Sequence, residues 1–169
     1  MERFYNPYLT DLLIIGYCTY YFMPVILGVI LKIQGKEKEF QEGLFTVLLC
    51  FYLSYVGYVL FPALGPRYTM LHLQQKPLEG VFLFDGINHL LNSLERIKRD
   101  AFPSGHTGIT LVVLYLAMKF ERRLLWAFVP CTMLLIIATI YCRFHYGVDI
   151  LGGVLLTGIT ILTVRVLYK

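Results

Sequence analysis

Long apolar runs with few charges constrain this chain more than any other feature. Five such runs cover about residues 12–31, 44–64, 104–120, 124–142 and 147–167. A helix needs about 20 apolar residues to cross the hydrocarbon core of a bilayer. Only 15% of the residues are charged, whereas soluble domains average about 25%. We therefore predict an all-α fold, a polytopic transmembrane helical bundle with five spans, forming a single integral-membrane domain over residues 1–169.

The segment between the second and third runs has a different pattern. From about residue 81 to residue 97, apolar side chains recur at helical spacing and polar side chains fill the gaps. The apolar positions are Leu83, Ile87, Leu90, Leu91, Leu94 and Ile97. This pattern predicts an amphipathic helix in the membrane interface. Two roles fit such a helix: covering a lipid-facing entrance, or tying two spans together at the surface.

Five spans place the connecting segments on alternate sides of the membrane. One side holds the N-terminus, residues 65–103 and residues 143–146; the other holds the remaining connections and the C-terminus. Eight of the fifteen Lys and Arg residues fall on this second side: Lys32, Lys36, Lys38, Lys119, Arg122, Arg123, Arg165 and Lys169. With Arg67 and Arg143 set aside as candidate site residues, the positive-inside rule places the second side in the cytoplasm.

Charge and cysteine content exclude several classes of protein. The net charge is +4, without a basic cluster or a nucleic-acid motif, so we expect no nucleic-acid partner. The cysteines lie inside apolar runs without a C-x-x-C pair; they are Cys18, Cys50, Cys131 and Cys142. We interpret them as buried thiols, not as a disulfide framework or a metal site.

Three polar clusters interrupt the apolar chain. They are Gly65–Arg67, Pro103–His106 and Arg143–Asp149. The five-span topology places all three on the same side of the membrane. Because topology alone does not require this, the coincidence is the main indication of a functional site.

The second cluster, with the two arginines, predicts an anion site. Ser104 has the side chain of a helix N-cap, and a helix start offers unpaired N–H groups and a partial positive charge. Gly105 would let a ligand approach the backbone closely. Arg67 and Arg143 would clamp a tetrahedral oxyanion through forked hydrogen bonds, and Arg99 is a further candidate. Each residue alone also has an ordinary explanation, such as a snorkelling arginine.

The histidines and one carboxylate predict the chemistry. An ionisable group one turn into a spanning helix is costly unless it is paired, which marks Asp149 as a functional candidate. Asp149 lies four residues after His145, on the same helix face. It can accept the Nδ1 proton of His145 and leave Nε2 free as a nucleophile. Protonated His106 can supply the leaving oxygen with a proton, so the set suits phosphoryl transfer without a metal ion or other cofactor.

At these positions the chain resembles the type 2 phosphatidic acid phosphatase superfamily, which shares its site with vanadium haloperoxidases. That signature is Lys, six residues, Arg-Pro; then Pro-Ser-Gly-His; then Ser-Arg, five residues, His, three residues, Asp. The second element matches fully at Pro103–His106, and the third matches at His145 and Asp149. The resemblance covers about residues 65–153 and implies a helical membrane bundle.

The chain departs from the signature at two places. Leu60 stands at the lysine position and Tyr68 at the proline position, while Ala138 and Thr139 replace Ser-Arg. Arg143 follows Thr139 by four residues and on a helix would share its face, which would supply the guanidinium from the next turn. This variant is similar to the branch containing inositol phosphorylceramide synthases. The family usually has six spans, so its first helix would precede this sequence, or this member has five.

The resemblance implies a lipid phosphatase that forms a phosphohistidine at His145 and releases phosphate with water. The expected substrate is lipid A 1-phosphate, as the leading candidate, or undecaprenyl pyrophosphate, phosphatidylglycerophosphate or phosphatidic acid, in a bacterial inner membrane with the site facing the periplasm. A lipid head-group phosphotransferase is the alternative. A silent scaffold or transporter fits less well, because His106, His145 and Asp149 are all present. The sequence leaves the lipid and the oligomeric state open.

Overall fold

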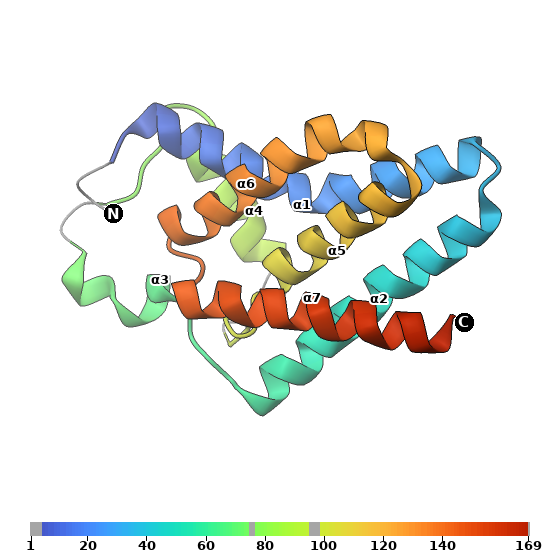
Figure 1. Ribbon diagram of the computed structural model, residues 1–169. Coiled ribbons are helices and arrows are strands. Elements are labelled where there is room, and N and C mark those ends of the chain that lie inside the picture. Colours follow the sequence, from blue (N-terminus) through green and yellow to red (C-terminus); the bar gives the residue numbers. More distant parts are fainter. Residues whose placement is uncertain (1–4, 75–76, 95–98, 169) are drawn as a thin grey trace.

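The computed structural model describes residues 5–74, 77–94 and 99–168, and this part of the chain contains helices and no strand. In order, the elements are α1 (Pro7–Ile33), α2 (Glu37–Leu60), α3 (Pro66–Thr69), the 3-10 turn η2 (Leu71–Leu73), α4 (Phe84–Leu94), α5 (Gly105–Phe120), the 3-10 turn η3 (Arg122–Leu124), α6 (Leu125–Tyr141) and α7 (Gly147–Leu167). Figure 1 shows the long helices running roughly side by side, with the short helices α3 and α4 toward one end.

Four helical stretches in the described chain are long and apolar enough to cross a membrane: Pro7–Ile33, Glu37–Leu60, Arg122–Tyr141 and Gly147–Leu167. They correspond to four of the five predicted spans. The predicted third span is the apolar helix α5, which has only 16 residues. At 1.5 Å per residue, α5 is about 24 Å long. Because it is shorter than the four candidate spans, its ends do not extend as far as theirs.

Helix α5 is the centre of the bundle. It packs against α1, α2, α6 and α7, and its side chains Val112, Val113, Leu116 and Ala117 are almost completely buried. A helix that is apolar on all sides is expected in such a position. Because the short helix is surrounded by longer ones, its polar first turn lies within the bundle, which is where the predicted site residues Gly105 and His106 are found.

The helix ends differ from the ends of the apolar runs. Helix α1 begins at Pro7, because the side chain of Asn6 accepts hydrogen bonds from the N–H groups of Tyr8 and Leu9. Helix α2 begins at Glu37, several residues before the apolar run that starts at about residue 44, and the turn before it contains Gly35 at a φ of 69°. Apolar runs mark the lipid-facing depth of a helix, whereas caps decide where it begins.

The amphipathic helix predicted at about 81–97 is present as α4, Phe84–Leu94; positions 95–97 lie outside the described residues. Phe84 and Leu91 are buried against the start of α1, beside Leu13 and Ile14. The carboxylate of Asp11 on α1 accepts four backbone N–H bonds from residues 81–84, at 2.9–3.3 Å. This contact caps α4 from another helix and fixes α4 to α1.

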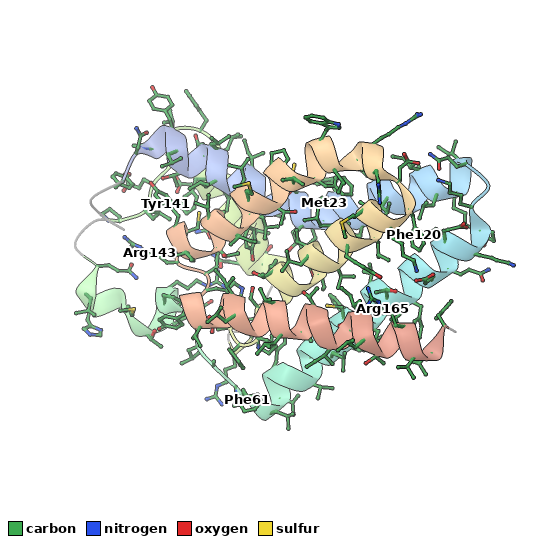
Figure 2. The ribbon with its side chains drawn as sticks, in the orientation of Figure 1. Met23, Phe61, Phe120, Tyr141, Arg143 and Arg165 are labelled. Atoms are coloured by element: carbon green, nitrogen blue, oxygen red, sulfur yellow. The ribbon has the colours of Figure 1, made fainter. Side chains whose placement is uncertain are left out.

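The two ends of the bundle have different polar contacts. Figure 2 shows Tyr141 and Arg143 at the end that also holds α3, and Phe120 and Arg165 toward the other end. At the second end, ion pairs join Lys36 to Glu121 and Lys119 to Glu42. The Gln34 amide, with Lys36, holds the pKa of Glu121 below its usual range. The three polar clusters of the sequence are all at the first end, as predicted.

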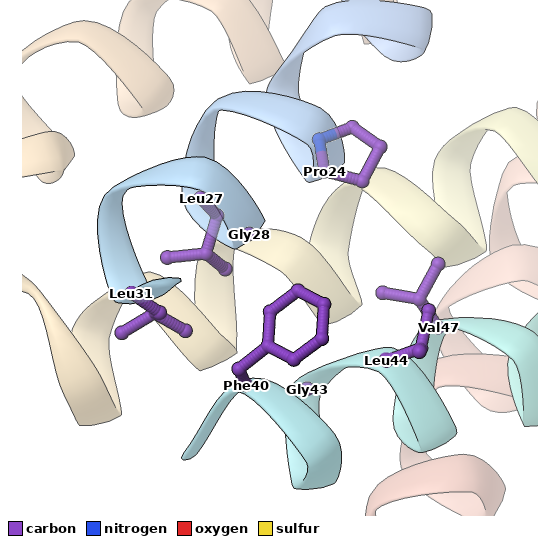
Figure 3. Close-up of a pocket in the computed structure, with 8 residues that line it drawn as sticks. All are labelled: Pro24, Leu27, Gly28, Leu31, Phe40, Gly43, Leu44 and Val47. Carbon is purple, nitrogen blue, oxygen red and sulfur yellow. The ribbon is translucent and has the colours of Figure 1, made fainter. Parts of the chain in front are cut away.

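Two apolar cavities lie between α1 and α2. The smaller, of about 70 Å³, is lined by Pro24, Leu27, Gly28, Leu31, Phe40, Gly43, Leu44 and Val47, as Figure 3 shows. The larger, of about 230 Å³, is lined by Tyr20, Tyr21, Pro24, Val47, Leu48, Phe51 and Ile109. The two cavities share Pro24 and Val47 and so adjoin each other along the helix pair.

Candidate active site

Ser104 caps α5, as the sequence predicts. Its hydroxyl oxygen accepts the N–H of Thr107 at 3.3 Å and donates to the Thr107 hydroxyl at 3.0 Å. The Ser104 side chain is fully buried, and its backbone N–H donates to the carbonyl of Asp149 at 2.9 Å. The serine therefore holds the start of α5 against the start of α7, which brings the second and third polar clusters together.

Gly105 lets α2 approach the first turn of α5 closely. A Cβ at this position would collide with the hydroxyl of Tyr58 and lie 3.3 Å from the hydroxyl of Ser54, both on α2. A similar close approach occurs on α7, where a Cβ at Gly153 would lie 2.7 Å from the carbonyl oxygen of Ser104. Three helices therefore meet closely at the first turn of α5.

His145 is held by a backbone carbonyl. Its Nδ1 lies 2.9 Å from the carbonyl oxygen of Ala101, and the side chain is only 5% exposed. A carbonyl oxygen only accepts hydrogen bonds, so Nδ1 carries the proton and Nε2 keeps its lone pair. This is the predicted tautomer, but the short hydrogen bond from Nδ1 goes to the carbonyl of Ala101 and not to the predicted acceptor, Asp149.

Asp149 is buried and caps α7. Its Oδ2 accepts the backbone N–H of Tyr146 at 2.7 Å and lies 3.5 Å from Nδ1 of His145. The side chain is 2% exposed. The carboxylate therefore makes its short hydrogen bond to the backbone at the N-terminus of the helix, where its negative charge is favoured. It faces His145 at the longer distance of an ion pair.

His106 lies beside His145. The centroids of the two rings are 5.7 Å apart, so the structure brings together the two imidazoles that the sequence separates by 39 positions. The ring of His106 also contacts Tyr17 and Tyr20 of α1, with centroids 4.7 Å and 4.5 Å away. The hydroxyl of Tyr17 lies 2.8 Å from Nε2 of His106.

Arg67 lies on the short helix α3 and faces aromatic rings. Its guanidinium carbon lies 4.9 Å from the ring centroid of Tyr68 and 5.1 Å from that of Phe144. One guanidinium nitrogen donates to Oδ1 of Asn92 on α4 at 2.8 Å. Its backbone N–H donates to the carbonyl of Arg143 at 3.1 Å. The first and third polar clusters are thus joined directly.

Arg143 does not share a helix face with Thr139, contrary to the sequence expectation. Helix α6 ends at Tyr141, and Arg143 has a left-handed φ of 62°. The N–H of Phe144 donates to the carbonyl of Thr139, and that of Arg143 to the carbonyl of Ile140, which is the Schellman ending usually made with glycine. The turned backbone lets the guanidinium donate to Oε1 of Gln74 at 2.6 Å.

Several residues of this region had no signal in the sequence. Tyr17 lies in an apolar run and is indistinguishable there from a packing residue. Asn92 and Gln74 lie in the segment between α2 and α5, where polar residues are common. Arg99 remains exposed near Ala101. Among residues 5–74, 77–94 and 99–168, no three His, Cys, Asp or Glu side chains gather closely enough to hold a metal ion.

The two imidazoles and the carboxylate thus lie together where α5 and α7 begin, and Arg67 is connected to them through aromatic rings. The rings are linked in space: Arg67 lies over Phe144, Phe144 stacks on Tyr17 with centroids 4.5 Å apart, and Tyr17 contacts His106. An imidazole with a free lone pair can attack a phosphate, and arginine side chains can bind one through forked hydrogen bonds. The arrangement therefore suits phosphoryl transfer.

Comparison with known proteins agrees with this interpretation. The chain is 25% identical over 132 residues to a PA-phosphatase related-family protein of Dictyostelium discoideum; the match covers 73% of the chain and 24% of that relative. The chain thus spans about a quarter of the length of this relative. No solved structure matches the chain significantly. The family model of the PAP2 superfamily matches residues 4–163, and the chain therefore belongs to the PAP2 superfamily.

Proposed function

We propose that this protein is a metal-independent lipid phosphatase that works through a phosphohistidine. Membership of the PAP2 superfamily supports a phosphatase-type function, and the apolar helices indicate an integral membrane protein. The observation that carries the finer proposal is the pair of imidazoles with centroids 5.7 Å apart, of which His145 has its Nδ1 proton held by Ala101.

In the first step, the lone pair on Nε2 of His145 attacks the phosphorus of the lipid phosphate. The bond from phosphorus to the lipid oxygen breaks, and that oxygen takes a proton from His106. The Nδ1 proton of His145 stays in place and donates to Ala101, which stabilises the cationic ring that forms. Asp149, buried 3.5 Å from Nδ1, adds a negative charge on the same side of the ring.

In the second step, water attacks the phosphohistidine. His106 now accepts a proton from the water as the new bond to phosphorus forms, and the bond from phosphorus to Nε2 breaks. Inorganic phosphate leaves, and both histidines return to their starting protonation states. The overall reaction consumes one water and releases one alcohol or one shorter lipid phosphate. This mechanism requires both rings to reach the same phosphate, and the separation of 5.7 Å between their centroids supports it.

The phosphate would be held by Arg67, Arg143 and the start of α5, where Ser104 fixes the helix and Gly105 presents its backbone. Gln74 adds a further donor, because its amide nitrogen is buried without a hydrogen-bond acceptor in the described part of the chain. A buried donor without an acceptor is costly. A phosphate oxygen beside Arg143 would remove this cost. Exposed Arg99 would provide a longer-range attraction.

The substrate would be a lipid with an exposed phosphate, such as lipid A 1-phosphate, undecaprenyl pyrophosphate, phosphatidylglycerophosphate or phosphatidic acid. The larger cavity between α1 and α2 is lined by Tyr20, whose ring lies against His106. It therefore offers apolar space for a hydrocarbon chain beside the phosphate site. By the charge distribution, the site would face away from the cytoplasm, which in a bacterial inner membrane means the periplasm.

A head-group phosphotransferase is the second candidate. It is favoured by the departures at the motif positions: Leu60 is 65% exposed at the end of α2 and supplies no cation to the site, and Arg143 replaces the arginine expected at Thr139. The chemistry would be the same as far as the phosphohistidine. A lipid hydroxyl would then take the place of water.

The test is phosphate release by the purified protein in detergent. We expect release from at least one of the four lipid phosphates with EDTA present, and inhibition by orthovanadate, which resembles the five-coordinate transition state. A strict requirement for an added divalent metal would contradict the mechanism. Repeating the assay with a diacylglycerol or ceramide acceptor separates the candidates, since a transferase yields a new phospholipid instead of free phosphate.

A further inference from the structure

The hydroxyl of Tyr17 touches the proposed general acid. Its oxygen lies 2.8 Å from Nε2 of His106 and 3.4 Å from Nδ1. We propose that Tyr17 is a positioning residue, which fixes the orientation of the His106 ring. This inference rests on the role of His106 proposed above, and it extends the site to α1, which carries none of the three polar clusters.

Tyr17 is held firmly enough to position another ring. It is 1% exposed and stacks on Phe144, with centroids 4.5 Å apart and an interplanar angle of 30°. Leu13, Ile14 and Leu91 belong to the same buried cluster. A side chain packed in this way has few rotamers. The position of its hydroxyl is therefore set by the α1 backbone and by Phe144, the residue before the proposed nucleophile.

The hydrogen bond can hold the ring of His106 in either protonation state. A tyrosine hydroxyl can donate to a neutral imidazole nitrogen or accept from a protonated one. Tyr17 can therefore keep the ring in place both before and after the proton leaves. Since only the imidazolium can give the leaving oxygen a proton, Tyr17 acts on the first step through His106.

Other titratable groups face His106 and are unchanged by a substitution at Tyr17. Tyr20 of α1 contacts the ring, with centroids 4.5 Å apart, and His145 lies 5.7 Å away with Asp149 of α7 behind it. On α2, the hydroxyl of Tyr58 approaches the neighbouring backbone of Gly105. A change in the spectrum of His106 in a Tyr17 variant can therefore be assigned to the lost hydroxyl.

The first experiment is Tyr17→Phe, which keeps the ring and removes the hydroxyl. We expect kcat to fall roughly tenfold or more, the scale of a lost hydrogen bond to a charged group, with KM unchanged. The loss should fall on kcat because a misplaced proton donor slows the chemical step and leaves the binding of the lipid phosphate intact. The matched control is Tyr141→Phe: this buried hydroxyl accepts the N–H of Asn6 in the same cluster, and its removal should leave kcat unchanged.

The second experiment separates this proposal from the proposed function. In a His106→Ala background, assayed at high enzyme concentration, Tyr17→Phe should have no further effect; an equal loss in both backgrounds overturns the proposal. Ring ¹⁵N spectra of histidine-labelled protein, assigned with His106→Ala, should show His106 moving in Tyr17→Phe and not in Tyr141→Phe. If the wild-type protein releases no phosphate from any lipid, the proposed function fails, but these spectra still test the contact between Tyr17 and His106. His106 signals that do not move in Tyr17→Phe overturn the positioning role of Tyr17.

Discussion

The two histidines and the two arginines of the site are held in different ways. The contact partners of His145 and His106 are the backbone of Ala101 and the aromatic face of α1, both buried among the long helices. The hydrogen-bond partners of Arg67 and Arg143 are the side-chain amides of Asn92 and Gln74. Both amides belong to residues 66–94, the part of the α2–α5 connection that carries α3 and α4, whereas Ala101 lies at the end of that connection, three residues before Ser104.

This difference suggests a division of work. Groups that move protons must keep one geometry, because a displacement of about 1 Å costs about a hundredfold in rate. Groups that bind phosphate tolerate small displacements better, so they can be held by side chains outside the long helices. We therefore expect substitutions around the histidines to change kcat, and substitutions in the segment of residues 66–94 to change KM.

The largest effect should come from His145→Gln. Glutamine is a polar side chain of similar size, but its amide nitrogen, at the position of Nε2, has no nucleophilic lone pair. We expect kcat to fall by at least roughly a thousandfold, the scale for loss of a nucleophile, with the thermal midpoint little changed. The assay is phosphate release, and His89→Gln on the exposed face of α4 is the control. Near-normal turnover in His145→Gln would disprove the phosphohistidine mechanism.

The second prediction distinguishes the role of the Arg143 side chain from the cost of its left-handed backbone. Arg143→Gly removes the guanidinium but relieves the left-handed φ of 62°, which costs a non-glycine residue about 1 kcal/mol. We expect kcat/KM to fall about a hundredfold, for loss of a forked cation, while the backbone relief offsets part of the stability lost with the Gln74 contact. Arg143→Lys should lose less activity and regain no stability.

The measurements for this pair are kcat/KM and the thermal midpoint in detergent. Arg123→Ala, at the other end of the bundle, should leave both unchanged. If Arg143→Lys were as inactive as Arg143→Gly, charge alone would not hold the phosphate, and the forked geometry would be the requirement. If Arg143→Gly kept its activity, Arg143 would be a structural residue only.

The pattern of residue types predicts most of the helices and part of the site. Apolar runs, the N-cap at Ser104 and the amphipathic pattern of α4 depend on neighbours close in sequence, and these features are present in the structure. The juxtaposition of His106 and His145 could also be anticipated, because alternating spans bring the polar clusters to one end. The length and period of an apolar pattern can be read from neighbouring residues, and the alternation of spans follows from their number.

The contacts that orient the side chains could not be predicted in the same way. Tyr17 meets His106 across 89 positions, and Asp11 meets residues 81–84 across about 70. The acceptor for His145 is a backbone carbonyl, which any residue supplies. The helical spacing of four residues does not bring Arg143 to the face of Thr139, because α6 ends in a Schellman motif with Arg143 in a left-handed conformation. That motif usually contains glycine, so its presence here had no signal in the sequence. Such contacts depend on tertiary packing, which outweighs local preference.

The third effect tests the attachment of the segment. Asp11→Asn keeps the shape of the side chain but leaves one carbonyl oxygen for four backbone N–H groups. We expect the amides of residues 81–84 and of α4 to exchange hydrogen faster, and KM to rise severalfold with kcat nearly unchanged, because α4 carries the partner of Arg67. Asp85→Asn, exposed in the first turn of α4, is the control. Unchanged exchange in Asp11→Asn would mean that apolar packing alone holds α4.

The smallest effect should come from Asn92→Ala, which removes the exposed hydrogen bond to Arg67. A single hydrogen bond of this kind contributes about 0.5–1.5 kcal/mol, so we expect KM to rise about two- to tenfold with kcat unchanged. Asn88→Ala on the same helix is the control. In an Arg67→Ala background, Asn92→Ala should add nothing, because its effect passes through the guanidinium. A fall in kcat in Asn92→Ala would show instead that the segment also sets the geometry of the histidines, and the division between the two groups would not hold.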